Sequence, residues 1–169
     1  MWCIRFLVLW LAWCGFATAQ LGRGAVVYTL PLGYVEGFQH TTESGFVANV
    51  YLGVPYALPP LGELRFEKPR RIANHSEERV SAKKFGPSCY PHHRDGIRAN
   101  MDHSEDCLFL NVMAPAERTF SGYPVLVFIH GGGFEFGSSM DYGYKVPCEN
   151  FVSQGMVFVS IEYRLGALG

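Results

Sequence analysis

The apolar segment at residues 124–129 ends at His130 and continues into three glycines, and it constrains the fold more than any other feature of this chain. An almost unbroken apolar run of this length favours a strand that is buried on both faces of a sheet. The glycines that follow, Gly131, Gly132 and Gly133, allow the backbone to turn and to direct its N–H groups outward. Such a loop suits the binding of a developing negative charge, because fixed donors in a dry cleft need no reorganisation during a reaction.

A second apolar segment, at residues 156–161, is also predicted as a buried strand. Between the two strands, residues 146–154 are predicted as a helix, with Gly155 at the position that favours a left-handed cap. The order of strand, glycine loop, helix and strand predicts a βαβ crossover. A ligand site is then expected at the carboxyl end of the first strand.

The preceding residues are predicted to be mainly short strands and loops. Residues 34–39, 45–49 and 50–55 read as three strands, because β-prone runs alternate with turn residues. Residues 57–104 are predicted to be irregular apart from a short strand near Val80, and another strand is predicted at residues 108–113. The predicted fold class is therefore α/β, with a small antiparallel hairpin region followed by the first strands of a mixed central sheet.

The first residues have the pattern of a secretory signal peptide, which we expect to span residues 1–19. Arg5 provides the positive end, residues 6–17 are apolar, and Ala19 completes a small-x-small cleavage pattern. Cleavage is predicted before Gln20, which places the protein in the secretory pathway. The apolar run is shorter than the ~20 residues that a membrane span needs. A buried N-terminal helix is the alternative interpretation.

Composition excludes several classes of protein. Apolar residues make up 49% of the chain and charged residues 17%, which argues against a disordered or coiled-coil chain. Removing Arg5 with the signal peptide leaves 13 basic residues of the 14 and all 15 acidic ones, a net charge of −2. No basic patch suggests a nucleic-acid partner. No His or Cys spacing predicts a metal, no cofactor is expected, and the oligomeric state stays open.

Three cysteines remain after the signal peptide, in an oxidising compartment. Cys89 and Cys107 are close enough in sequence to close a small loop, which would stabilise the fold by about 3 kcal/mol. Cys148 is either free and buried or paired with a residue beyond Gly169. Asn74 begins an Asn-His-Ser sequon in a polar stretch, which predicts a glycosylated surface loop.

Five segments in order together resemble the type-B carboxylesterases, the cholinesterase-like branch of the α/β-hydrolase fold. The segments are residues 51–57, 59–66, 105–112, 130–134 and 162–166. They cover nearly all of residues 33–169, so residues 20–169 are expected to form the amino-terminal part of that domain, incomplete at the C-terminus. Two features differ from the pattern: Glu162 stands where the family commonly has Asn, and Gly169 lies inside a motif that normally continues into Phe-Leu.

The resemblance implies a role for the glycine loop in an oxyanion hole. Gly132 and Gly133 would donate backbone N–H groups to the oxygen of a tetrahedral intermediate, and Gly131 belongs to the same loop. The third donor would follow a serine that this chain does not contain. His130 would order the loop by hydrogen bonding or contact the reacting groups, and it is not the triad histidine. Phe134 would line the acyl pocket or pack in the core.

The resemblance also implies two links near the entrance of the site. Cys89 and Cys107 match the first disulfide of the family. Arg65 and Glu105 match an ion pair between the proline-rich segment and the Glu-Asp-Cys box, and a buried pair would lose several kcal/mol when one partner is removed. The alternative for these two residues is a pair of unrelated surface charges.

The function implied is that of a secreted serine carboxylic-ester hydrolase, which acts on a small-molecule ester through an acyl-enzyme. The sequence contains no Gly-x-Ser-x-Gly, so none of the triad is present and the chain alone is expected to be inactive. One alternative is a catalytically inactive, neuroligin-like adhesion ectodomain, against which the retained glycines at 131–133 argue. Another is that the 169 residues are the whole product of a truncated gene.

Overall fold

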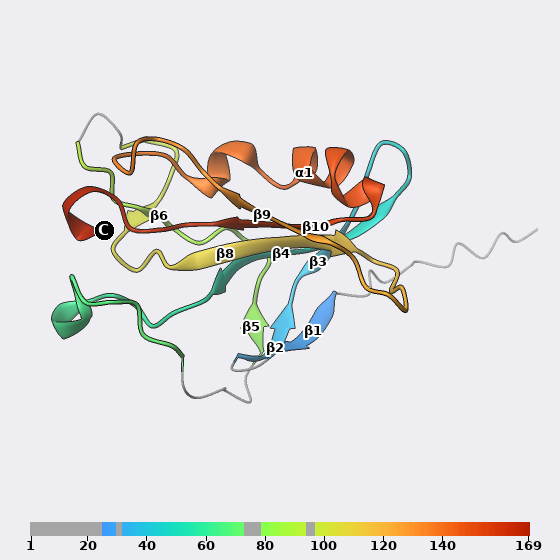
Figure 1. Cartoon of the computed structure of the whole chain (residues 1–169), viewed down its shortest axis with the longest axis horizontal. Helices are drawn as coiled ribbons and strands as arrows, with labels where there is room; N and C mark the ends of the chain where they lie inside the picture. Colours follow the sequence, from blue (N-terminus) through green and yellow to red (C-terminus); the bar gives the residue numbers. More distant parts are fainter. Residues whose placement is uncertain (1–24, 30–31, 73–78, 94–96) are drawn as a thin grey trace, which may run out of the picture.

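The computed structural model describes residues 25–29, 32–72, 79–93 and 97–169. The main sheet has five strands, and Figure 1 shows α1 (Lys145–Asn150) on one side of it and a smaller sheet on the other. The five strands are, in spatial order, β3 (Phe38–Thr41), β4 (Val47–Pro55), β8 (Phe109–Pro115), β10 (Val157–Ile161) and β9 (Val125–Ile129). This mixed sheet with few helices fits the predicted α/β class. The predicted signal peptide and Gln20 lie outside the described residues.

The remaining elements are short strands and single turns of 3-10 helix. The three-stranded sheet has the order β1 (Val26–Thr29), β2 (Gly33–Glu36) and β5 (Val80–Ser81). A further pair consists of β6 (Ser88–Cys89) and β7 (His103–Ser104), which the sequence did not predict. Single turns of 3-10 helix are η1 (Gly62–Leu64), η3 (Ser139–Tyr142), η4 (Val152–Gln154) and η5 (Gly166–Leu168).

The βαβ crossover predicted from the two apolar segments is confirmed. β9 and β10 are parallel neighbours, with Val125 opposite Val157 and Ile129 opposite Ile161. The connecting helix is shorter than predicted, because α1 ends at Asn150 and η4 follows it. Gly155 adopts the left-handed conformation expected after the helix, with φ of 79°.

The predicted strand boundaries near the amino terminus are wrong in two places. The predicted strand at residues 34–39 is divided at Gly37 between β2 and β3, which belong to different sheets. The backbone of β4 passes very close there, since a Cβ at Gly37 would lie 2.1 Å from the carbonyl oxygen of Val50. The predicted strands at residues 45–49 and 50–55 are one strand, β4, because pairing with β3 and β8 continues through both.

Apolar side chains form a separate cluster on each side of the five-stranded sheet. The helix-side core lies against α1 and η4 and consists of Ala48, Val50, Leu52, Met113, Cys148, Val152 and Phe158. The opposite cluster lies against the small sheet and consists of Ala25, Val35, Tyr51, Val54 and Ala82. A register shift in β4 between Tyr51 and Val54 changes which side chains face each cluster.

The expectation that β9 is buried on both faces is wrong. Leu126 and Phe128 pack against the helix-side core, but Val125, Val127 and Ile129 are 57–61% exposed. Among the described residues, the small sheet packs against β4 and β8 and does not extend over β9. One face of β9 is therefore exposed in this part of the chain.

Candidate functional site

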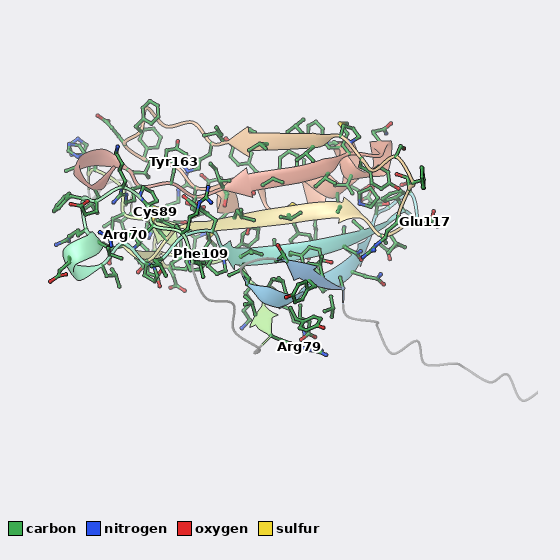
Figure 2. The ribbon with its side chains drawn as sticks, turned by 60° about the horizontal axis from the view of Figure 1, so that its bottom comes forward. Arg70, Arg79, Cys89, Phe109, Glu117 and Tyr163 are labelled. Carbon is green, nitrogen blue, oxygen red and sulfur yellow. A yellow bond between two sulfur atoms is a disulfide. The ribbon has the colours of Figure 1, made fainter. Side chains whose placement is uncertain are left out.

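The glycine loop, residues 130–137, begins where β9 ends. Because β10 runs parallel to β9, the residues after it, Glu162 and Tyr163, lie at the same edge of the sheet. Figure 2 shows Tyr163 and Cys89 at this edge and Glu117 at the opposite one. The sheet thus brings two segments about 30 residues apart in the sequence to one place, which is where α/β folds bind ligands.

The backbone of the loop is unusual at three successive residues. Gly132, Gly133 and Phe134 have φ values of 123°, 62° and 63°. A Cβ at Gly132 would lie 1.8 Å from the carbonyl oxygen of Phe136, so only glycine fits there. Phe134 holds a left-handed conformation without being glycine, which marks local strain of a kind that gathers at functional sites.

The carbonyl of Gly132 accepts hydrogen bonds from the N–H groups of Glu135 and Phe136, which closes the turn. Among the described residues, the N–H groups of Gly132 and Gly133 donate to no partner. Free N–H donors beyond the carboxyl end of a strand can bind an anion or a polarised carbonyl oxygen.

His130 anchors the start of the loop from below. Its side chain is 1% exposed, and its Nδ1 lies 2.9 Å from the carbonyl oxygen of Gly131. The ring stacks on Tyr163 with centroids 4.3 Å apart, and the Tyr163 hydroxyl donates to the His130 carbonyl. Burial raises the pKa of Tyr163, so this hydroxyl remains a donor at neutral pH. The loop-ordering role and the catalytic contact considered for His130 both remain predictions.

Glu162 is a buried carboxylate that the sequence analysis did not assign to the site. Its Oε1 accepts hydrogen bonds from the Ser138 hydroxyl at 2.8 Å and from the Ser139 N–H and hydroxyl at 2.7 Å each. Its Oε2 lies 3.9 Å from the His130 Nε2. The available signal was an acidic residue directly after the apolar run at 157–161, at the position where the resemblance leads one to expect Asn.

The carboxylate belongs to a buried group of polar side chains, here called the polar cluster: Ser88, Asn111, Ser138, Ser139, Ser160 and Glu162. Asn111 is at its centre, because its Nδ2 donates to Ser139 at 2.9 Å and to Ser160 at 3.2 Å. Its Oδ1 accepts from the N–H of Gly53, also at 2.9 Å. The segment after the glycine loop is thus tied to β4, β8 and β10.

A model of the carboxylesterase family matches residues 24–169. The chain belongs to this family. The match confirms the resemblance that the five sequence segments indicated, and it covers every element described above.

Relatives in the family include proteins named as esterases and a protein named as neuroligin-like. The chain is 40% identical to gut esterase 1 of Caenorhabditis briggsae, over 86% of this chain and 25% of the relative. It is 34% identical to carboxylesterase 5A of the dog (Canis lupus familiaris), over 96% of this chain and 30% of the relative. It is 36% identical to the neuroligin-like protein glit-1 of Caenorhabditis elegans, over 70% of this chain and 17% of the relative. The chain therefore spans about a quarter of the length of gut esterase 1.

The two links that the resemblance implied lie beside the site. Cys89 and Cys107 form a disulfide with Leu165 packed against it. Arg65 and Glu105 form an ion pair whose side chains are 47% and 23% exposed, so it is not the buried pair that would contribute several kcal/mol. Exposed pairs contribute about 1 kcal/mol or less, since water screens the charges.

Of the remaining predicted residues, Phe134 belongs to the glycine loop, whereas Cys148 and Asn74 do not. Phe134 is 75% exposed, so it does not pack in the core. Cys148 lies in α1 and faces the helix-side core as a free thiol among the described residues, and burial raises its pKa to about 12. Asn74, the predicted glycosylation site, lies outside the described residues.

Two kinds of site are absent from the described residues, a cluster of metal ligands and a membrane-spanning helix. No group of three or more His, Cys, Asp or Glu side chains there is placed to hold a metal ion. Within the same residues, no helix has the length and apolar character to span a membrane.

Proposed function

We propose that this chain supplies the oxyanion-binding segment of a secreted serine carboxylic-ester hydrolase. The observation that carries the proposal is the pair of free N–H groups at Gly132 and Gly133, beyond the carboxyl end of β9. In acyl transfer the carbonyl oxygen of the ester becomes an anion, and two fixed donors stabilise that anion more than the uncharged ester. Membership of the carboxylesterase family supports this assignment of the loop.

In the proposed reaction, a serine outside this chain attacks a small-molecule ester, and its acyl-enzyme is then hydrolysed by water. The residues described here take no proton and form no covalent bond. They hold the oxygen of the tetrahedral intermediate, with Gly132 and Gly133 as donors and His130 and the polar cluster as support. We therefore expect the 169-residue chain alone to leave p-nitrophenyl acetate intact. Hydrolysis by this chain, sensitive to a serine-directed organophosphate, would contradict that expectation.

The decisive experiment uses protein expressed from the whole reading frame that contains this chain. We expect it to hydrolyse p-nitrophenyl acetate and to be labelled by an organophosphate on a serine. The variant Gly133→Ala should lower kcat at least tenfold, because a side chain disfavours the φ of 62° that directs this N–H, and loss of one donor costs about 10²–10³ in kcat.

Gly45→Ala is the matched control. Gly45 also has a positive φ, 84°, and a Cβ there likewise meets nothing within 4 Å, but it lies in the turn between β3 and β4. The two variants should lose similar stability, and only Gly133→Ala should lose kcat. If neither substrate hydrolysis nor serine labelling occurs, the enzyme proposal is wrong. Binding to a cell-surface protein in that case would favour the adhesion alternative.

Export is the second part of the proposal. The Cys89–Cys107 disulfide supports it, since disulfides persist in oxidising compartments. We expect N-terminal sequencing of the exported protein to begin at Gln20. Treatment with a glycosidase should reduce its mass, and Asn74→Gln should make that reduction smaller. An unprocessed amino terminus in a cytosolic protein would refute this part.

A further inference from the structure

Two buried polar atoms face each other beneath the glycine loop. The Nε2 of His130 and the Oε2 of Glu162 are 3.9 Å apart, on side chains that are 1% and 2% exposed. Neither atom has a hydrogen-bond partner among the described residues. We propose that these two side chains hold one proton between them and act together as positioning residues for the glycine loop.

The proton count follows from the hydrogen bond on the other side of the imidazole. The Nδ1 of His130 lies 2.9 Å from the carbonyl oxygen of Gly131, which can only accept, so Nδ1 carries a hydrogen. With no further proton, the lone pair of Nε2 would face an ionised carboxylate, and two buried acceptors would oppose each other. One additional proton removes this conflict.

The additional proton can reside on either Nε2 or Oε2, and the net charge of the pair is the same in both cases. On Nε2 it makes an imidazolium beside a carboxylate, and on Oε2 it makes a carboxylic acid that donates to a neutral imidazole. Both forms contain the same number of protons and have no net charge. A movement of about 1 Å would bring the atoms from 3.9 Å to the ~2.8 Å of a charge-assisted hydrogen bond.

Other groups near the pair do not replace this proton. Among the described residues, Tyr56 and Tyr163 interact with Glu162, and Tyr163 also stacks on His130. Arg164 lies next to Tyr56, and Tyr142 lies next to Tyr163. The hydroxyls of Tyr56 and Tyr163 donate to the main-chain carbonyls of Glu162 and His130. The guanidinium of Arg164 donates to a carbonyl in the proline-rich segment. The three donors from Ser138 and Ser139 all reach Oε1 and leave Oε2 bare.

The pair connects both ends of the glycine loop. His130 precedes the three glycines, and Ser138 follows the loop and donates to the same Glu162 carboxylate. A neutral pair also avoids placing a negative charge below donors that bind an oxyanion. This last point rests on the proposed function, whereas the proton count and the coupling of the two side chains do not.

A double-mutant cycle on protein from the whole reading frame tests the coupling through the melting temperature. Glu162→Gln keeps an oxygen for the serine donors and supplies an NH₂ that can donate to the His130 Nε2. His130→Asn should lower Tm by about 2 °C or more, because it leaves a buried carboxylate without its partner. In the E162Q background the same change should lower Tm by less than half as much. Equal decreases in both backgrounds would overturn the proposal.

Glu63→Gln is the control for the chemical change alone, because Glu63 lies exposed in η1. It should leave Tm at the wild-type value and should not alter the effect of His130→Asn.

A second measurement needs no variant and is independent of esterase activity. In ¹⁵N-histidine-labelled protein at pH 7, the Nδ1 of His130 should be protonated. Either Nε2 is protonated too, or infrared spectra show the band of a buried carboxylic acid that is absent in E162Q. A neutral imidazole together with an ionised Glu162 would refute the shared proton. If hydrolysis fails while these signatures appear, only the proposed function is wrong.

Discussion

Two neighbouring cross-strand pairs on the same face of the sheet differ completely in chemistry. Phe158 of β10 lies opposite Met113 of β8, and two residues along the strands Ser160 lies opposite Asn111. The first pair belongs to the helix-side core and the second to the polar cluster. The pairs are about 7 Å apart along the strands, because each residue rises about 3.3 Å.

The difference between the two regions is one of specificity. Apolar contacts in the helix-side core depend on volume and are not directional, so similar side chains can replace one another at small cost. In the polar cluster each buried donor needs a particular acceptor, and an unpaired one is costly. Within two residues along each strand, the sheet therefore changes from an apolar packing surface under α1 to a set of specific buried hydrogen bonds under the glycine loop.

The largest expected effect is in the helix-side core. Phe158→Ala should lower the free energy of unfolding by about 3–5 kcal/mol, because it removes a ring that stacks on Phe128 and Phe151 and leaves a cavity. Denaturant titration measures this loss. Phe158→Leu is the control and should lose clearly less. If both variants lose the same amount, packing volume does not govern this region.

In the polar cluster, Asn111→Leu tests whether hydrogen bonds matter more than volume. The change keeps a side chain of similar size but leaves the Gly53 N–H without its acceptor and removes a donor to Ser139 and Ser160. We expect a total loss of about 1–3 kcal/mol, the cost of a buried donor left without its acceptor, because the Ser139 hydroxyl still donates to Glu162. Met113→Leu on the same face should cost less than about 1.5 kcal/mol. A smaller loss for Asn111→Leu than for Met113→Leu would remove the contrast between the regions.

Cys148 gives the helix-side core a pH dependence at alkaline pH. Burial, with a smaller contribution from Glu149, raises the pKa of its thiol to about 12, whereas an unfolded thiol has a pKa of about 8.5. Between these values the unfolded chain releases a proton that the folded chain retains, so stability falls as pH rises, by at most about 1.4 kcal/mol per pH unit. Below about pH 8 the thiol is neutral in both states and the effect is absent.

Unfolding midpoints between pH 8 and 11 check this slope. Cys148→Ala should show a shallower decline than the wild type, which separates the thiol from tyrosines and lysines that titrate in the same range. Parallel declines in the two proteins would show that the thiol does not contribute.

The smallest effect is expected at the exposed Arg65–Glu105 pair, which contrasts with the buried pair of His130 and Glu162. Arg65→Met should change the free energy of unfolding by about 1 kcal/mol or less, because both side chains keep contact with water. Urea titrations at low and high salt measure it, and salt should reduce the difference between the proteins. A loss of several kcal/mol would mean that this exposed pair contributes as much to the free energy of unfolding as a buried pair does.

Some of these regions could be anticipated from the residues and some could not. The two apolar runs predicted β9, β10 and the crossover between them, because a strand long enough to be buried needs a continuous apolar stretch. The division of residues 34–39 at Gly37 could not be predicted, since it depends on the approach of β4 from another part of the chain. The exposed face of β9 was missed for a similar reason, because periodicity does not say what packs against a strand.

The residues of the site also fall into two groups, those that the sequence indicated and those that only the fold brings together. The three glycines at 131–133 indicated a loop with free N–H groups, a property of local backbone chemistry that follows from residue type. Ser138 and Asn111 did not stand out, because each is an ordinary polar residue until the fold surrounds it. Glu162 was noted only as a difference from the family pattern, without a role in the site. The partners of these three residues lie 23–58 residues away in the chain, so only the folded structure brings them together.

The sequence by itself determined the apolar strands, the glycine loop at the end of one of them and membership of the carboxylesterase family, because these depend on residue types and their order. The tertiary structure alone decided that His130 and Glu162 face each other, that the Arg65–Glu105 pair is exposed, and that Phe134 lies outside the core. Burial and charge compensation depend on neighbours from distant segments, and those neighbours are in place only after the parallel strands have paired.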